Sequence, residues 1–372
     1  MFEKNKKIFC IIITSLLLIY GTNFINAETL IKEPYIDAKC AIAMDTKTKA
    51  VMYEKNSLMI VPMASTTKII TALVAIKYGN FNKKVEISSK AANIKGSTVG
   101  YKKGETITIN ELLYGLMLRS GNDAAIALSE GVAGSSDNFV KLMNEYAAEI
   151  GIVNTHFKTP HGLDDDEHYS TAYDLALATS EARKCSKFNG IVASKDIDAS
   201  LYGFTRSYHN INKILWQIPE ATGVKTGYTG NAGKCLVTSL SVKGHDVIIV
   251  VLNCTPRWRE TRKIYDYILS AFDYKKVCSE GENAKEIMVN DTKVRLAFKE
   301  DITIPIKNGS SYEIKIAAPK RITQDIKKGD SIGKITIYSD GKNIYSQSLV
   351  SKDNVSVKKR FKWLNMFKLK KH

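Results

Sequence analysis

The spacing of apolar residues changes along this chain, and that change constrains the fold more than any other feature. Apolar residues recur at helical intervals in 65–78, 110–150 and 172–183. Between 220 and 252 they form three short runs, the last of them almost wholly valine and isoleucine, which is typical of buried strands. Beyond 280, apolar and polar residues alternate, as in half-buried strands. A helix-rich segment is therefore followed by two kinds of β-structure.

Strands are also predicted ahead of the helical segment. Two apolar runs within 38–55 flank a polar turn, which predicts a hairpin. Pro62 precedes the first helix and Gly79 ends it, and a last helix is predicted over 264–272. Because strands lie on both sides of the helical segment, we expect an α/β (α+β) domain in which one sheet carries a helical insertion and is flanked by helices.

The last part of the chain predicts a small all-β domain. Its alternating segments include 301–306, 312–316 and 334–338, and Asp340-Gly341 is a strong hairpin signal. Residues 279–350 contain neither histidine nor cysteine. We therefore expect the chemistry to lie in the preceding domain.

The N-terminus has the layout of a secretory signal. Three lysines at positions 4, 6 and 7 precede an apolar run over 8–20, and Ala27 closes a short polar stretch. An uncleaved membrane anchor is the alternative, although a span needs about 20 apolar residues. We expect cleavage after Ala27 and a mature chain outside the cytoplasm.

The net charge of +16 is concentrated at the ends of the chain. Residues 351–372 alone hold eight basic residues and one acidic residue, together with Phe361, Trp363, Leu364 and Phe367 on one arc of a helical wheel. Nucleic-acid binding would require a basic patch on the folded body, so no such partner is predicted. We expect the tail to lie on an anionic membrane surface, with a merely solvated basic tail as the alternative.

Six cysteines are present, of which Cys10 lies in the signal. The other five show no CxxC and no framework spacing. Cys235 and Cys254 lie on two neighbouring predicted strands and could face each other. For most of the five, the simpler interpretation is a buried small apolar residue.

Catalytic chemistry is suggested first by Ser65-Thr-Thr-Lys68, an SxxK motif. Residues three apart share one face of a helix, so the Lys68 amine can reach the Ser65 hydroxyl. A serine hydroxyl becomes a good nucleophile when a base takes its proton, and a buried lysine can be neutral enough to do so. The motif alone is weak evidence, because it recurs at Ser331, Ser339 and Ser356 where no helix start is predicted.

Two further motifs strengthen the first match. Ser120-Gly121-Asn122 (SxN) lies between two helical runs, and Lys225-Thr226-Gly227 (KTG) lies on a predicted strand. A second SxN at Ser136 lies in a helical stretch, where the serine is more simply a helix cap. The ordered set SxxK, SxN and KTG is characteristic of penicillin-binding proteins and class A β-lactamases.

The likeness extends beyond the three motifs. It is carried by 62–72, 118–125, 159–164, 168–174 and 223–229, and in the β-domain by 328–333 and 340–342. Over roughly 30–350 the chain resembles the low-molecular-mass penicillin-binding proteins, the serine-type D-alanyl-D-alanine carboxypeptidases (peptidase S11-like). The resemblance implies a penicillin-binding/β-lactamase-like transpeptidase fold. It also implies a catalytic domain over 28–277 and a small all-β domain over 278–350, while the residue patterns of the two ends predict a signal peptide over 1–27 and a basic aromatic tail over 351–372.

The resemblance also implies roles for individual residues. Ser65 would attack the carbonyl between two D-alanines, Lys68 would accept its proton, and Ser120 would relay a proton to the departing amine. Backbone N–H groups of Ser65 and Tyr228 would bind the oxyanion. The residues implied in substrate binding are Asn122, Lys225, Thr226, Gly227 and Tyr228.

The implied partners are peptidoglycan stem peptides ending in D-Ala-D-Ala and, as covalent inhibitors, β-lactam antibiotics. No metal or other cofactor is expected, since the six histidines show neither HExxH nor HxxEH spacing. We expect the polar residues of the loop region, His161, Asp164, His168 and Asp174, to fix that region by hydrogen bonds.

Three alternatives remain open on the same residues. A β-lactamase needs a base that hydrolyses the penicilloyl ester, and 163–168 contains acids but no ExxN-like pattern. A D,D-endopeptidase or transpeptidase would use the same acyl-enzyme with another substrate or acceptor. A non-catalytic wall-binding protein is disfavoured by the intact motifs, and its function would survive Ser65→Ala.

Overall fold

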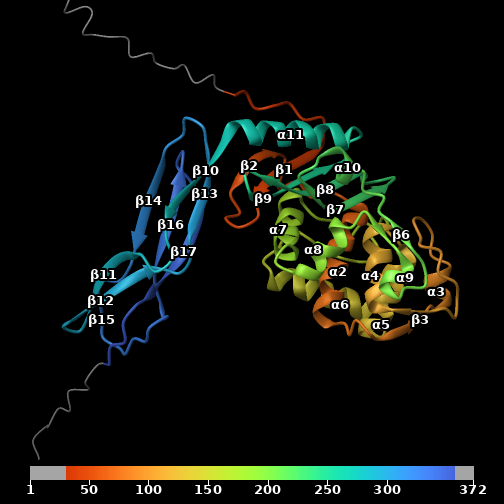
Figure 1. The fold of residues 1–372 in the computed structure, drawn as a ribbon, viewed down its shortest axis with the longest axis horizontal. Helices are drawn as coiled ribbons and strands as arrows, with labels where there is room; N and C mark the ends of the chain where they lie inside the picture. Colours follow the sequence, from red (N-terminus) through yellow and green to blue (C-terminus); the bar gives the residue numbers. More distant parts are fainter. Residues whose placement is uncertain (1–30, 357–372) are drawn as a thin grey trace, which may run out of the picture. The chain divides into compact units, whose positions relative to one another are not determined.

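The computed structural model describes residues 31–356, and all elements below lie in the compact unit that begins at Glu33 (Figure 1). The predicted signal over 1–27 and most of the predicted tail helix lie outside the described residues.

One antiparallel sheet forms the base of the first domain, in the order β2-β1-β9-β8-β7. The predicted hairpin and the three predicted strands after 220 are confirmed. Residues 40–45 pair with 247–252, so the beginning of the domain lies against strands two hundred residues later. The strands are β1 (Cys40–Asp45), β2 (Val51–Lys55), β7 (Ala221–Thr229), β8 (Gly233–Val242) and β9 (His245–Leu252).

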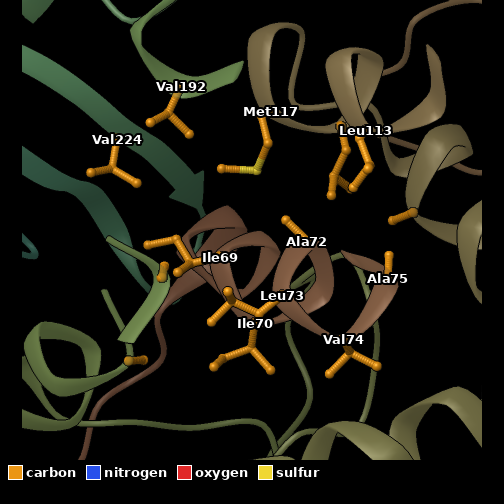
Figure 2. Packing of buried hydrophobic residues seen from close by; sticks show 14 of the residues in the cluster. Ile69, Ile70, Ala72, Leu73, Val74, Ala75, Leu113, Met117, Val192 and Val224 are labelled. Atoms are coloured by element: carbon orange, nitrogen blue, oxygen red, sulfur yellow. The ribbon is translucent and has the colours of Figure 1, made fainter. Parts of the chain in front are cut away.

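The helical insertion covers one face of this sheet (Figure 1). At its centre lies α2 (Lys68–Tyr78), in which residues 68–75 are all buried. Leu113 and Met117 of α4, Val192 of α8 and Val224 of β7 surround it (Figure 2). The surrounding helices are α4 (Ile109–Leu118), α5 (Asn122–Ala133), α6 (Ser136–Glu149), α7 (Ala172–Ala182) and α8 (Ser186–Ala193).

The start and end of α2 follow from local sequence. The predicted helix over 65–78 begins as a short 3₁₀ turn, η1 (Ala64–Thr67), and becomes α-helical only at Lys68. Gly79 ends it as predicted, and a Cβ there would lie 2.4 Å from the Ala75 carbonyl oxygen. The tighter turn matters because it carries Ser65.

Two helices cover the other face of the sheet, α10 (Ile214–Gln217) and α11 (Arg257–Ala271). The predicted boundaries of the last helix are wrong at both ends. The helix begins at Arg257 instead of 264, and Phe272 opens the next strand. The shorter elements of the domain are β3 (Lys84–Glu86), α3 (Ser89–Ala92), β4 (Thr106–Thr108), β5 (Asp196–Ile197), α9 (Ala199–Tyr202) and β6 (Tyr208–His209).

The all-β domain is a six-stranded sheet, β14-β16-β17-β12-β11-β15, with the strand pair β10-β13 contributing to the same apolar core. Asp340 and Gly341 form the predicted hairpin turn, both with positive φ. The strands are β10 (Phe272–Cys278), β11 (Asn283–Val289), β12 (Thr292–Phe298), β13 (Ile302–Lys307), β14 (Tyr312–Ala317), β15 (Arg321–Ile322), β16 (Ser331–Ser339) and β17 (Lys342–Ser351). Across 31–356, none of the helices has the length and apolar character required to cross a membrane.

Two minor expectations need correction. The cap of α6 is Ser135, whose hydroxyl accepts from the Asn138 N–H, whereas Ser136 is already helical. Cys235 and Cys254 do not face each other, because Cys235 packs in the core beneath the helical insertion and Cys254 in the core on the opposite face of the sheet. The cysteine thiols of the described chain are all free, and all but Cys185 are buried.

Candidate active site

The site is built around Ser65 in the 3₁₀ turn. Ala64 has a φ of 50°, a left-handed conformation that non-glycine residues adopt at some cost, and it turns the chain into η1. The backbone of Gly227 lies against this turn, since a Cβ there would be 3.1 Å from the Ser65 nitrogen. The KTG strand and the SxxK turn are thus directly apposed.

The Lys68 amine lies at the centre of a buried set of acceptors. Its Nζ is 2.9 Å from Ser65 Oγ, 2.8 Å from Asn122 Oδ1 and 2.6 Å from the His161 carbonyl oxygen. Burial lowers the pKa of Lys68 well below its usual value, and the nearby charge of Lys225 lowers it further. The folded protein therefore favours the neutral amine that a base requires.

The directions of these contacts decide what the neutral amine can do. A neutral amine has two N–H donors and one lone pair. If Asn122 Oδ1 and the His161 carbonyl accept the two N–H groups, the lone pair is left facing Ser65 Oγ. The His161 carbonyl oxygen can only accept a hydrogen bond, so one N–H of the amine must point towards it. This contact restricts how the amine, and with it the lone pair, can be oriented.

The SxN segment lies where α4 ends and α5 begins. Ser120 is buried and has a φ of 61°, and Asn122 is the first residue of α5. The Asn122 side chain donates to the Lys95 carbonyl oxygen at 2.7 Å while accepting from Lys68. Ser120 is not among the three partners of the Lys68 amine, so the SxN segment contacts the SxxK motif through Asn122.

The KTG segment occupies β7 beside the nucleophile turn. Lys225 is buried, and its amine donates to the Thr226 carbonyl oxygen at 2.9 Å. Burial lowers the pKa of Lys225 to about 7, with a further contribution from the Arg257 charge. Tyr228, the next residue after KTG, has a side chain that is 67% exposed.

The loop region over 159–174 is fixed by hydrogen bonds, as predicted from its polar residues. His168 accepts from the Lys158 N–H at Nδ1, so its Nε2 carries the proton that Thr67 Oγ1 accepts. Burial lowers the pKa of His168 to about 4 and that of His161 to about 3, so both rings are neutral at pH 7. Asp174, in α7, accepts hydrogen bonds from the Asn154 N–H and the Thr155 hydroxyl. These bonds join the end of the loop region to the segment that precedes it.

Two contributors to the site were missed in the sequence. The Arg257 guanidinium donates to the carbonyl oxygens of Gly227 and Cys235 at 2.8 and 3.1 Å, which supports the KTG strand from behind. Arg257 lies in a segment rich in basic residues, 257–263, that is typical of a polar helix face. The sequence therefore gave no signal that distinguishes Arg257 from its basic neighbours. The His161 carbonyl was missed because it is a backbone group, and any residue type would provide it.

A serine whose hydroxyl faces a buried amine, on an antiparallel sheet covered by helices, defines a class of acyl-transfer enzymes. In this class the serine of the SxxK motif is the nucleophile and the lysine is a candidate for its base. The comparisons agree with that assignment. Residues 27–255 match the family model described as D-alanyl-D-alanine carboxypeptidase, and residues 272–357 match that of the penicillin-binding protein 5 C-terminal domain. The chain belongs to the D-alanyl-D-alanine carboxypeptidase family.

Similar proteins cover almost the whole chain. The D-alanyl-D-alanine carboxypeptidase DacF of Bacillus subtilis is 32% identical over 339 residues, covering 86% of each chain. DacA of Escherichia coli is 30% identical, covering 88% of this chain and 86% of its own. The crystal structure of penicillin-binding protein 5 from Haemophilus influenzae superposes with a TM-score of 0.76 at 30% identity, covering 88% of this chain and 99% of that one. The similarity therefore extends over both the sheet-and-helix domain and the all-β domain.

Proposed function

We propose that this carboxypeptidase removes the terminal D-alanine from peptidoglycan stem pentapeptides through an acyl-enzyme on Ser65. The observation that carries the proposal is the buried Lys68 amine, which lies 2.9 Å from Ser65 Oγ. The other two partners of this amine are Asn122 Oδ1 and the His161 carbonyl oxygen. The names of the relatives and of the family supply the D-Ala-D-Ala substrate class.

In the acylation step, Lys68 takes the Ser65 proton as Oγ bonds to the carbonyl carbon between the two D-alanines. The resulting oxyanion would accept from the N–H groups of Ser65 and Tyr228, which lie on the two apposed segments. As the intermediate collapses and the C–N bond breaks, Ser120 would pass its hydroxyl proton to the departing D-alanine amine and take the proton that Lys68 had received from Ser65. A water molecule then hydrolyses the ester, which returns the Ser65 hydroxyl and the Lys68 amine to their initial state.

Substrate recognition would use the groups around this centre. Asn122 uses one lone pair and one N–H within the protein, which leaves one of each for the substrate amide. Lys225 in its charged form, with the Thr226 hydroxyl and the close backbone of Gly227, would receive the terminal carboxylate. The strained amide of a penicillin carries a comparable carboxylate, so β-lactams would acylate Ser65 by the same route.

The two lysines predict a bell-shaped pH dependence of kcat/KM. Lys68 must be neutral, so the rate falls as the pH drops through its lowered pKa. Lys225 must be charged, so the rate also falls above pH about 7 as its charge is lost. A bound carboxylate stabilises the charged form, and the alkaline limb should lie at higher pH in kcat than in kcat/KM. In Lys225→Arg, whose guanidinium stays charged, the alkaline limb should disappear; a limb that remains at the same pH would assign it to another group.

The decisive experiment measures both the covalent adduct on Ser65 and the release of D-alanine. Purified residues 28–356 are incubated with a fluorescent penicillin, the adduct is followed by intact mass, and D-alanine release from a peptide ending in D-Ala-D-Ala is measured. We expect a lasting adduct on Ser65 and D-alanine release, both lost in Ser65→Ala. Rapid adduct turnover without D-alanine release would indicate a β-lactamase, and neither product would indicate a non-catalytic wall protein.

We further propose that the chain is exported by its N-terminal signal and works at the outer face of the cytoplasmic membrane. The lysines, apolar run and Ala27 of residues 1–27 support export. The basic and aromatic composition of 351–372 supports contact of the tail with an anionic membrane surface.

A further inference from the structure

A carboxylate at the edge of the site joins two parts of the catalytic apparatus that are far apart in the sequence. The Thr229 hydroxyl donates to Asp164 Oδ1 at 2.6 Å, and the Asn231 N–H donates to Asp164 Oδ2 at 3.2 Å. Thr229 is itself held, since its hydroxyl accepts from the Ala232 N–H at 3.1 Å. Asp164 thus connects the loop after His161 to the end of β7 and the turn that follows.

On the loop side, Asp164 lies three residues from the carbonyl that orients Lys68. The intervening Gly162 has a φ of 87° and is packed against the nucleophile turn, where its Cβ would lie 2.1 Å from the Ala64 carbonyl oxygen. Leu163 donates its N–H to His161 Nδ1 at 3.2 Å. The segment 161–164 is therefore a short, tightly placed chain between Lys68 and the Asp164 carboxylate.

On the strand side, Thr229 directly follows Tyr228, whose N–H is the second proposed oxyanion donor. Because the Asp164 carboxylate accepts from both Thr229 and Asn231, it fixes the end of β7 on both sides of the strand-to-turn transition. Asp164 therefore links the strand end to the segment that carries the His161 carbonyl.

We propose that Asp164 is a positioning residue that couples the His161 carbonyl to the oxyanion end of β7. This inference rests on the proposed function, because it assigns Asp164 a part in acylation. The two hydrogen bonds are solvent-exposed, so their loss affects global stability little. Misplacement of groups at the reacting centre by about 1 Å can nevertheless cost about a hundredfold in rate.

A double-mutant cycle tests the coupling. Asp164→Ala and Thr229→Val each remove one side of the contact, and we expect each to lower the maximal rate of Ser65 acylation by about tenfold or more. The penicillin concentration for half-maximal rate should stay near that of the wild type, since the contact orients the reacting groups. The double variant should lose less than the product of the two single losses, because both changes break the Thr229–Asp164 hydrogen bond, while each also removes one hydrogen bond of its own, Asn231 to Asp164 or Ala232 to Thr229.

The matched control is Asp166→Asn, which removes the same charge from the same exposed loop. It should acylate at the wild-type rate. An equal loss in this control would show that charge, and not the contact, is responsible, and multiplicative losses in the double variant would also overturn the proposal. So would a wild-type acylation rate in Asp164→Ala.

A second readout does not depend on catalysis. Deuterium exchange of the backbone amides in 161–164 should be faster in Asp164→Ala and Thr229→Val and unchanged in Asp166→Asn. Unchanged exchange in the first two variants would overturn the proposal even if their rates fell. If the wild type forms no adduct on Ser65, the proposed function fails, whereas exchange still decides whether the contact holds the loop.

Discussion

Replacing Lys68 with methionine is expected to lower the rate of Ser65 acylation by about 10²–10⁴-fold, the range that general bases contribute. Methionine fills a similar volume but offers no amine, so the Ser65 proton has no acceptor at 2.9 Å. The rate of adduct formation with a fluorescent penicillin measures the effect.

The same variant should still fold, because Lys68 is buried and its desolvated amine opposes folding. Circular dichroism and a cooperative thermal transition would show this. Acylation of Lys68→Met at more than about a tenth of the wild-type rate would contradict the role of Lys68 as the base.

Replacing Gly162 with alanine is expected to damage both stability and activity. Its φ of 87° is unfavourable for alanine, and the new Cβ would lie 2.1 Å from the Ala64 carbonyl oxygen and 2.6 Å from the Ala64 carbonyl carbon. The backbone of the nucleophile turn would have to move. Conformational strain and overpacking together predict a loss of about 2–5 kcal/mol in the free energy of unfolding. The rate of Ser65 acylation should fall as well, because residue 162 directly follows His161, whose carbonyl oxygen accepts from the Lys68 amine.

The control variant Gly151→Ala separates the effect of backbone strain from the effect of the steric clash. Gly151 also has a positive φ, 78°, but nothing lies within 4 Å of a Cβ built there. This control should lose only about 1–2 kcal/mol from backbone strain and should keep its acylation rate. Denaturant unfolding of both variants measures the difference. Equal losses in the two variants would contradict the contact between Gly162 and the nucleophile turn.

Much of the fold was predictable because the period of the apolar residues is set locally. The hairpin over 38–55, the three strands after 220 and the turn at Asp340-Gly341 are all present. The errors lie at boundaries. Arg257 was not assigned to α11 because the first turns of that helix are mostly polar, and the helix is defined there by packing on the sheet.

For the site, the motifs in the sequence were enough to predict which residues could carry the proposed chemistry. Ser65, Lys68, Asn122 and Lys225 belong to motifs that can be recognised from their order and spacing along the sequence. The structure brings the Lys68 amine within hydrogen-bonding distance of both Ser65 and Asn122. The tertiary structure alone decided how they act. The His161 carbonyl orients Lys68, Arg257 supports β7, and Asp164 joins two loops. These contacts depend on backbone atoms and on distances between segments up to about a hundred residues apart, and a backbone carbonyl leaves no signature in the residue type that carries it.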